Sequence, residues 1–324
     1  MNSFGRKFCI QIWGESHGPH IGITIDGCPP GIPLSTDDFV TDLARRRAGA
    51  PGTTPRTEDD LPAFASGVFN GFTTGAPLTV LFTNQNIRSA DYEHLRATPR
   101  PGHADFVLHN KHNGFNDYRG GGHSSGRLTL GLVAAGVVAK KILGEVSVTA
   151  FLREAGGSTD IEAAIQEAVT RQDSIGGIVR CQVAGLPVGW GEPFFDSAES
   201  LISHIIFAIP AIKAIAFGSG FDAARMHGST HNDAILNEHG ETATNHAGGI
   251  NGGITNGNEL YFDVAVKPTS STPRPQLTWN RTTGSVEEFT VKGRHDLCIA
   301  LRVPVVVEAA TAIALADMKM VQYR

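Results

Sequence analysis

The sequence predicts an α+β fold built on antiparallel sheets. Segments that alternate between apolar and polar residues, as strands do, are mixed with segments of helical periodicity, and the two kinds follow no regular β-α-β order. With 324 residues, the chain can bury a large hydrophobic core. No Pro/Ser-rich linker, low-complexity tract or clear internal repeat divides it, so we expect residues 1–324 to form one domain.

The first helix is expected over residues 35–49. Ser35 can cap this helix, and Asp38 stands three residues later, as in a capping box. Alternation of apolar and polar residues predicts strands on either side of it, at 6–13, 19–27 and 76–86.

The middle of the chain contains a strongly apolar helix at 124–144. Its sides are almost all Leu, Val, Ala and Gly, so it is expected to be buried on most faces and to stop at Gly144. A helix that starts at residue 198 is interrupted at Pro210. The remaining elements are expected to be strands at 146–156, 175–191 and 258–271, and helices at 158–172 and 302–321.

Composition and charge exclude several classes of protein. Hydrophobic residues make up 41 % and charged residues 18 %, which excludes a disordered chain. A net charge of −5 gives no general attraction for nucleic acid, so an anionic ligand must meet locally clustered cations. The four cysteines form no C-x-x-C pair, which indicates reduced thiols and a cytoplasmic location. No signal peptide and no run of about 18 apolar residues is seen, so no membrane contact is expected.

The stretch GESHG, residues 14–18, fits the G-x-S-x-G pattern of a hydrolase nucleophile elbow. Such an elbow needs a strand before the serine and a helix after it. Here a predicted strand precedes Ser16, but Pro19 and a second alternating segment follow Gly18. A serine hydrolase that uses Ser16 is therefore the weaker alternative.

His227 and His231 stand four residues apart, which is the spacing of a helical zinc pair. The three residues between them are poor helix formers, and the glutamate of an H-E-x-x-H motif is absent. We therefore expect no metal site.

Two histidines lie in polar turns flanked by glycine. His17 stands near Glu15, and His103 stands near Asp105 in RPGHAD. A histidine held in such a turn can transfer protons near neutral pH, although a turn histidine can also simply cap the backbone.

Arginines accompany these histidines in segments bounded by glycine or proline, where their forked groups can bind carboxylates and phosphates. RGGGHSSGR runs into the start of the apolar helix, where free N–H groups and two serines favour an anion. KPTSS, after a predicted strand, is a second candidate phosphate-binding turn. The residues therefore point to a small ligand with several negative charges, acid–base histidines and a phosphate-bearing cofactor.

Seven motifs together resemble, in order, the diagnostic segments of the chorismate synthase family. They are WGESHGPHIGITIDGCPPGIPL, DLARRRAG, RPGHAD, DYRGGGHSSGRLT, NHAGGINGGI, KPTSS and KGRHDLCIALRVPVVVEA. The resemblance implies conversion of 5-enolpyruvylshikimate 3-phosphate to chorismate and phosphate by 1,4-elimination. It also implies reduced FMN as cofactor, a homotetramer, and helices sandwiched between antiparallel sheets. A reduced flavin can lend electron density as the phosphate leaves and then recover it.

The resemblance also implies roles for single residues. His17 resembles the acid that protonates the departing phosphate, and Ser16 is its hydrogen-bond partner in a substrate-binding turn. His103 resembles the group that protonates the reduced flavin, and Asp296 resembles the carboxylate that helps to relay the substrate proton. Arg46, Arg127 and Arg294 resemble clamps for the substrate or the flavin phosphate. The implied FMN site comprises His123, Ser124, Ser125, Ala211, Gly252, Lys267, Pro268, Thr269, Ser270, Ser271 and Arg294.

Several positions depart from the family pattern. His123 replaces a usual Arg, Gly126 a usual Ala and Leu128 a usual Glu. One permanent cation at the flavin is thereby lost, so FMN affinity is expected to be weaker or more dependent on pH. A non-catalytic flavin-binding homologue therefore stays open as a third alternative. The sequence also leaves open whether NADPH serves as reductant or a separate flavin reductase supplies the electrons.

Overall fold

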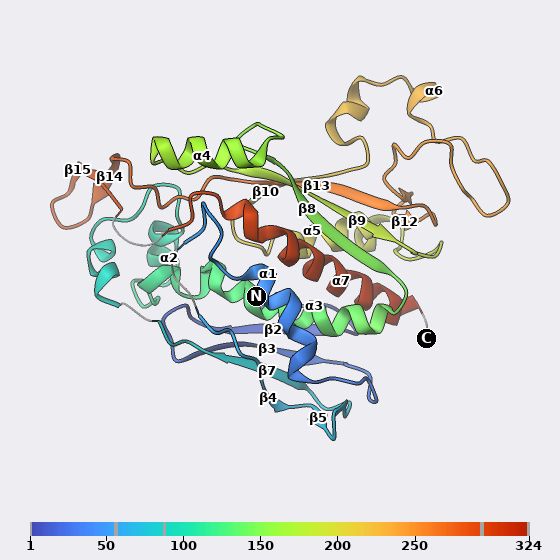
Figure 1. Ribbon diagram of the computed structural model, residues 1–324, viewed down its shortest axis with the longest axis horizontal. Coiled ribbons are helices and arrows are strands. Elements are labelled where there is room, and N and C mark those ends of the chain that lie inside the picture. Colours follow the sequence, from blue (N-terminus) through green and yellow to red (C-terminus); the bar gives the residue numbers. More distant parts are fainter. Residues whose placement is uncertain (1, 55–57, 87–88, 292–294, 323–324) are drawn as a thin grey trace.

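The computed structural model describes residues 2–54, 58–86, 89–291 and 295–322. It contains two antiparallel sheets with helices between them (Figure 1). The first sheet has the order β1-β2-β3-β7-β4 and the second the order β10-β13-β9-β8. The first comprises β1 (Ser3–Phe4), β2 (Cys9–Gly14), β3 (His20–Asp26), β7 (Leu78–Thr83) and β4 (Ala63–Ser66). The second comprises β10 (Ile212–Phe217), β13 (Leu260–Val266), β9 (Gly177–Ala184) and β8 (Ser147–Ala155).

Two apolar helices form the layer between the sheets. Helix α3 (Thr129–Leu143) packs on β2, β3 and β7, whereas α7 (Val303–Gln322) packs on β8 and β9. The two helices pack closely against each other where Gly136 meets Ala309. This approach requires a glycine, since a Cβ at Gly136 would lie 2.4 Å from the Ala309 Cβ. The expected α+β class with helices between antiparallel sheets is confirmed.

Shorter elements surround this core. The other α-helices are α1 (Val40–Arg46), α2 (Asp105–Lys111), α4 (Ile161–Arg171), α5 (Ala198–Ile206) and α6 (Gly228–His231). Three small hairpins pair β5 (Val68–Phe69) with β6 (Phe72–Thr73), β11 (Ile250–Asn251) with β12 (Ile254–Thr255), and β14 (Gln276–Asn280) with β15 (Ser285–Phe289). The 3₁₀ helices are η1 (Thr36–Phe39), η2 (Ser89–Arg96), η3 (Arg119–Ser124), η4 (Gly126–Leu128), η5 (Phe194–Asp196), η6 (Gly220–Arg225) and η7 (Ile299–Arg302).

Two elements were not expected from the sequence. The helix that begins as α5 ends before Pro210, and Ala211 then takes a positive φ of 75°, so that Ile212–Phe217 pairs with β13 as strand β10. The short stretch Gly228–His231 is helical despite its poor helix formers, because the N–H groups of Thr230 and His231 both donate to the His227 carbonyl over a single turn.

The closing helix is apolar along most of its length. By length and composition, Ile299–Gln322 is long and apolar enough to cross a membrane, but 78 % of its apolar stretch is buried inside the protein. Its position between the sheets explains that composition as a core helix.

Two buried carboxylates in α7 hold other parts of the chain. The Asp317 Oδ1 accepts the backbone N–H groups of Arg6, Lys7 and Phe8 at 2.8, 2.6 and 3.0 Å. Glu308 forms an ion pair with Arg45 at 2.6 Å and accepts a backbone N–H from β8. These bonds compensate the burial of both charges and anchor the N-terminal loop and α1 to the core.

Candidate active site

The glycine-rich loop η3 brings the two predicted histidines together. Gly120, Gly121 and Gly122 have positive φ values of 58°, 88° and 54°. A Cβ at Gly120 would lie 2.4 Å from Cε1 of His17, and one at Gly121 would lie 3.3 Å from Cε1 of His103. The loop therefore passes directly over both rings because it has no side chains there.

The GESHG turn connects β2 to β3, as a strand–turn–strand rather than an elbow before a helix. Ser16 is 1 % exposed and His17 is 4 % exposed. The Ser16 hydroxyl lies 3.2 Å from Nδ1 of His17, and the ring of Tyr92 packs edge-on against the imidazole. The Ser16 backbone N–H also donates to the Gly122 carbonyl at 3.1 Å, which ties the turn to the glycine loop.

A cationic cavity of about 200 Å³ lies beside this turn. Ser16, Gly120 and Tyr92 line it, and His17 lies behind them without lining it. Charged side chains on the rest of its wall are Arg46, Arg47, Arg100, Arg127, Arg302, Glu58, Asp60 and Asp296. Arginines outnumber carboxylates on this wall, so the cavity suits an anionic ligand.

Arg46 is a deeply buried arginine of this cavity. It donates to the Thr129 hydroxyl at 3.0 Å and to the Gly126 carbonyl at 2.8 Å, and it lies 3.7 Å from the Asp60 carboxylate. Burial lowers the pKa of Arg46 to about 9, and the charges of Arg302 and Arg127 act in the same direction. The cavity therefore concentrates positive charge, which an anionic ligand would relieve.

Asp296 stands on the same wall with both of its oxygens bonded. The backbone N–H of Thr54 donates to Oδ1 at 3.0 Å, and Arg302 donates to Oδ2 at 2.6 Å. Within the described residues, Nη2 of Arg127 and Nε of Arg302 are buried without a hydrogen-bond partner. Unpaired buried donors of this kind are rare in folded proteins, and a ligand with several anionic groups would satisfy them.

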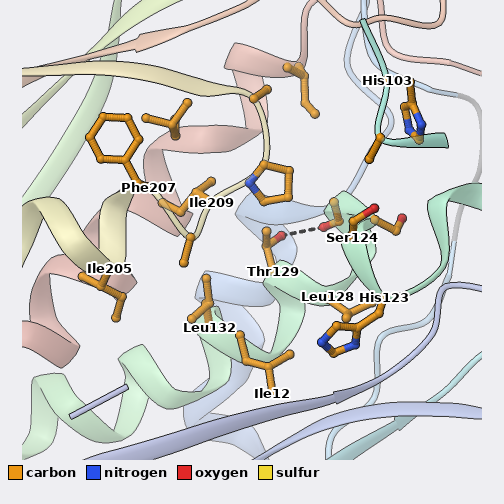
Figure 2. Close-up of a pocket in the computed structure, with 18 of the residues that line it drawn as sticks. Ile12, His103, His123, Ser124, Leu128, Thr129, Leu132, Ile205, Phe207 and Ile209 are labelled. Atoms are coloured by element: carbon orange, nitrogen blue, oxygen red, sulfur yellow. Dashed lines mark hydrogen bonds between the residues drawn. The ribbon is translucent and has the colours of Figure 1, made fainter. Parts of the chain in front are cut away.

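A larger cavity of about 670 Å³ adjoins the first. Figure 2 shows apolar side chains such as Ile12, Leu132 and Phe207 on one part of its wall, and His103 and Ser124 on another. Lys267 also lines it and donates to the Ser270 hydroxyl at 2.7 Å. Apolar walls with one cationic, hydroxyl-rich region fit the ring and the phosphate of FMN, so the residues present fit the cofactor that the resemblance implies.

His103 is oriented by a buried ion pair. Its Nδ1 lies 2.7 Å from the Asp105 Oδ1, and Arg100 binds the same carboxylate at 2.8 Å. Burial lowers the pKa of His103, the bond to Asp105 opposes this, and the charges of Arg100 and Lys267 lower it further. The bonds from Arg100 and His103 hold the pKa of Asp105 far below its usual range despite its burial. Nη2 of Arg100 also lies 3.1 Å from the same Nδ1, so Asp105 and Arg100 together hold the ring in place.

The profile of the family described as chorismate synthase matches residues 8–320. The chain belongs to the chorismate synthase family. A chorismate synthase of Chitinophaga pinensis is 65 % identical over 325 residues, covering 100 % of this chain and 98 % of the relative. A chorismate synthase of Dehalococcoides mccartyi is 44 % identical, covering 98 % of this chain and 96 % of the relative.

A solved structure supports the same fold. A crystal structure of chorismate synthase superposes with a TM-score of 0.75 at 24 % identity, covering 98 % of this chain and 93 % of that one. The relatives show that the chain is an enzyme with chorismate synthase activity. They give no support to the serine hydrolase or to the non-catalytic flavin-binding homologue, and the strand after GESHG is the wrong context for a nucleophile elbow.

The structure gathers most of the residues that the resemblance to chorismate synthases implied. Ser16, Arg46, Arg127 and Asp296 line the smaller cavity, and His17 lies directly behind it. The larger cavity is lined by His103, His123, Ser124, Ser125, Ala211, Lys267, Thr269, Ser270 and Ser271.

Two predicted residues are not brought to the cavities. Pro268 is exposed and is not part of either wall. Gly252 lies at the exposed tip of the β11–β12 hairpin, away from the residues that line them. Arg294 lies outside the described residues. Within the described ranges, no group of three or more His, Cys, Asp or Glu side chains is arranged to hold a metal ion.

His123, which the resemblance places at a usual arginine position, is held by the backbone of β2. Its Nδ1 lies 2.7 Å from the Gly14 carbonyl, which can only accept, so Nδ1 carries the proton. The ring is exposed and lines the larger cavity. Its bond to β2 therefore leaves Nε2 as the nitrogen available to a ligand.

Sequence reasoning missed several residues of the site. Asp60 forms an ion pair with Arg127, and Arg302 binds Asp296. Arg302 stands at the start of a predicted apolar helix, where a lone arginine facing the core could have been noticed. Asp60 lies in a segment with no periodicity, so only the folded chain reveals its partner.

Replacing His103 by asparagine is expected to make the free energy of unfolding less sensitive to mild acid. An unfolded chain binds a proton at His103 near pH 6.5, and the folded chain does so only at lower pH. The contribution of His103 is thus fully present above about pH 6.5 and is lost as the pH falls below it. Urea unfolding of both proteins between about pH 7 and pH 5 measures the difference. Parallel curves for the two proteins would contradict the assignment.

Proposed function

We propose that the chain converts 5-enolpyruvylshikimate 3-phosphate to chorismate and phosphate by 1,4-elimination. Reduced FMN would bind in the larger cavity and the substrate in the smaller one. The observation that carries this proposal is a shared wall, because five residues line both cavities: Gly120, Ser125, Gly126, Thr269 and Ile299. Because the two cavities adjoin at these five residues, ligands bound in them can lie in contact, as a flavin and its substrate must.

The smaller cavity fits the charges of this substrate. The substrate carries one phosphate and two carboxylates, close to four negative charges. Arg46, Arg127 and Arg302 offer forked donors, two of which have a buried N–H group without a partner among the described residues. Binding would therefore satisfy donors that the folded chain leaves unpaired.

The larger cavity fits the cofactor by the chemistry of its lining. Reduced FMN, when bound, supplies electron density as the phosphate leaves and takes it back afterwards, so no net oxidation occurs. Lys267, Ser270 and Ser271 would hold its phosphate, and the apolar side chains would exclude water from its ring.

Proton transfer to the departing phosphate would run through Ser16. The leaving oxygen takes both electrons of the broken C–O bond, and a proton neutralises the charge that develops on it. His17 does not line the cavity, but its Nδ1 lies 3.2 Å from the Ser16 hydroxyl, which does. A proton leaving His17 can therefore reach the cavity through that hydroxyl. Asp296 would receive the proton lost from the ring, since it is the carboxylate that the resemblance implies for this step.

The remaining family properties complete the proposal. We infer a homotetramer in the cytoplasm that binds neither nucleic acid nor membranes. The electrons for FMN would come from NADPH or from a separate flavin reductase. A sizing column with light scattering checks the assembly, and NADPH oxidation in the presence of FMN checks the reductant.

Phosphate release is the direct test of the proposed reaction. Purified protein with chemically reduced FMN is expected to release phosphate and form chorismate from the substrate under anaerobic conditions. Oxidised FMN, or no flavin, should give neither product. Folded, FMN-loaded protein that releases no phosphate would overturn the proposal.

A further inference from the structure

Asn84 connects two parts of the site that are distant in sequence. It follows the end of β7 and is 7 % exposed. Its Nδ2 donates to the Gly18 carbonyl at 2.8 Å and to the Glu15 carbonyl at 3.3 Å. Its Oδ1 accepts from Nε of Arg127 at 3.1 Å. One buried side chain thus binds both ends of the turn that carries Ser16 and His17, and also the arginine of the anion-binding wall.

The orientation of this amide is fixed by its partners. Backbone carbonyls can only accept hydrogen bonds, and a guanidinium can only donate them. Reversing the amide would oppose Nδ2 to Arg127 and Oδ1 to two carbonyls, and all three bonds would be lost. The Asn84 backbone N–H also donates to the Pro19 carbonyl at 3.0 Å, so the residue is anchored to the strand that leaves the turn.

We propose that Asn84 is a positioning residue that sets the distance between the proton-donating turn and Arg127. The inference rests on the proposed function, because it assigns different steps to the two groups that Asn84 holds. Arg127 also forms an ion pair with Asp60, so the amide adds the contact that couples this arginine to the turn. A shift of about 1 Å between a proton donor and its target can lower a rate about 100-fold.

An Asn84→Asp substitution tests the contact with Arg127 and the contacts with the turn separately. The carboxylate keeps an acceptor for Arg127, but it presents oxygen instead of N–H groups to the two turn carbonyls. We expect kcat to fall about 30-fold, since the turn moves, and KM to rise several-fold, since the added carboxylate charge opposes the anionic substrate. Asn84→Ala removes both contacts, so it should lower kcat and also raise KM. Combining Asn84→Asp with His17→Gln should lower kcat no further than His17→Gln alone.

Asn280→Asp serves as the matched control. Asn280 lies at the end of β14, donates through Nδ2 to Glu287 at 2.8 Å and accepts from the Thr282 N–H at 2.8 Å. It lines neither cavity, so this change should leave kcat and KM at the wild-type values.

Binding of inorganic phosphate, measured by calorimetry, gives a readout that does not depend on turnover. Asn84→Asp, through its added negative charge, and Asn84→Ala, through the lost contact with Arg127, should both bind phosphate several-fold more weakly than the wild-type protein. An unchanged kcat in Asn84→Asp, or losses that add fully to those of His17→Gln, would overturn the inference. A wild-type protein that binds phosphate but never releases it from the substrate would instead overturn the proposed function.

Discussion

A His17→Gln variant is expected to lose kcat by about 10²- to 10⁴-fold, which is the usual contribution of a general acid. Glutamine can occupy the space under Gly120 and can bond to Ser16, but it has no proton to give at neutral pH. KM should change little, because His17 does not line the cavity that would hold the substrate. Anaerobic phosphate release with reduced FMN measures both constants.

The contact between Ser16 and His17 makes this prediction more specific. If the proton passes through the Ser16 hydroxyl, Ser16→Ala should lower kcat by a similar factor, and the double variant should be no worse than either single one. Ser66→Ala is a suitable control, because Ser66 is exposed on the edge strand β4, where its hydroxyl donates to the Pro77 carbonyl. A Ser16→Ala enzyme with wild-type kcat would show that the proton takes another route.

An Asp317→Ala variant is expected to lose about 3 kcal/mol of the free energy of unfolding. Three backbone N–H groups converge on one oxygen of this 2 % exposed carboxylate, and removing it leaves the buried N–H of Phe8 and the part-buried N–H groups of Arg6 and Lys7 without this acceptor. Asp317→Asn keeps an acceptor oxygen without the charge, so its loss should be smaller. Urea unfolding followed by tryptophan fluorescence measures all three proteins.

The other acidic partner of Arg6 supplies the control for this experiment. Asp196 forms an ion pair with Arg6 at 2.7 Å, but both side chains are well exposed to solvent. Asp196→Ala should therefore cost less than about 1 kcal/mol. Equal losses in the two alanine variants would show that the burial of Asp317 does not govern its contribution.

The sequence predicted the parts of the fold that have strong local patterns. The capping residues Ser35 and Asp38 marked the first helical segment, where the Asp38 carboxylate accepts the Ser35 N–H at 2.7 Å. The apolar helix at 124–144 was recognised because almost every position had to face a packed neighbour. The strand β10 was missed, because an apolar run of this length fits a buried helix and a strand equally well.

The sequence predicted those site residues that belong to a local motif. It did not predict contacts between site residues that are far apart in the chain. GESHG and RPGHAD marked His17 and His103, since glycine and proline turns are visible in the sequence. His17 lies behind Ser16 because the backbone of the separate glycine loop η3 passes over its ring. No local sequence pattern could reveal this contact. The role of Asn84 depends on contacts with residues up to 69 positions away.

The segment that leads into β2 has a practical consequence for anyone who labels this enzyme. Asn2, Ser3 and Phe4 form part of the wall of the larger cavity, and the following loop is fastened to α7. A fluorophore or other bulky group attached at any of these three residues would occupy space inside the cavity. Binding of small molecules to this cavity should therefore be measured on protein in which these three residues are unlabelled and unchanged.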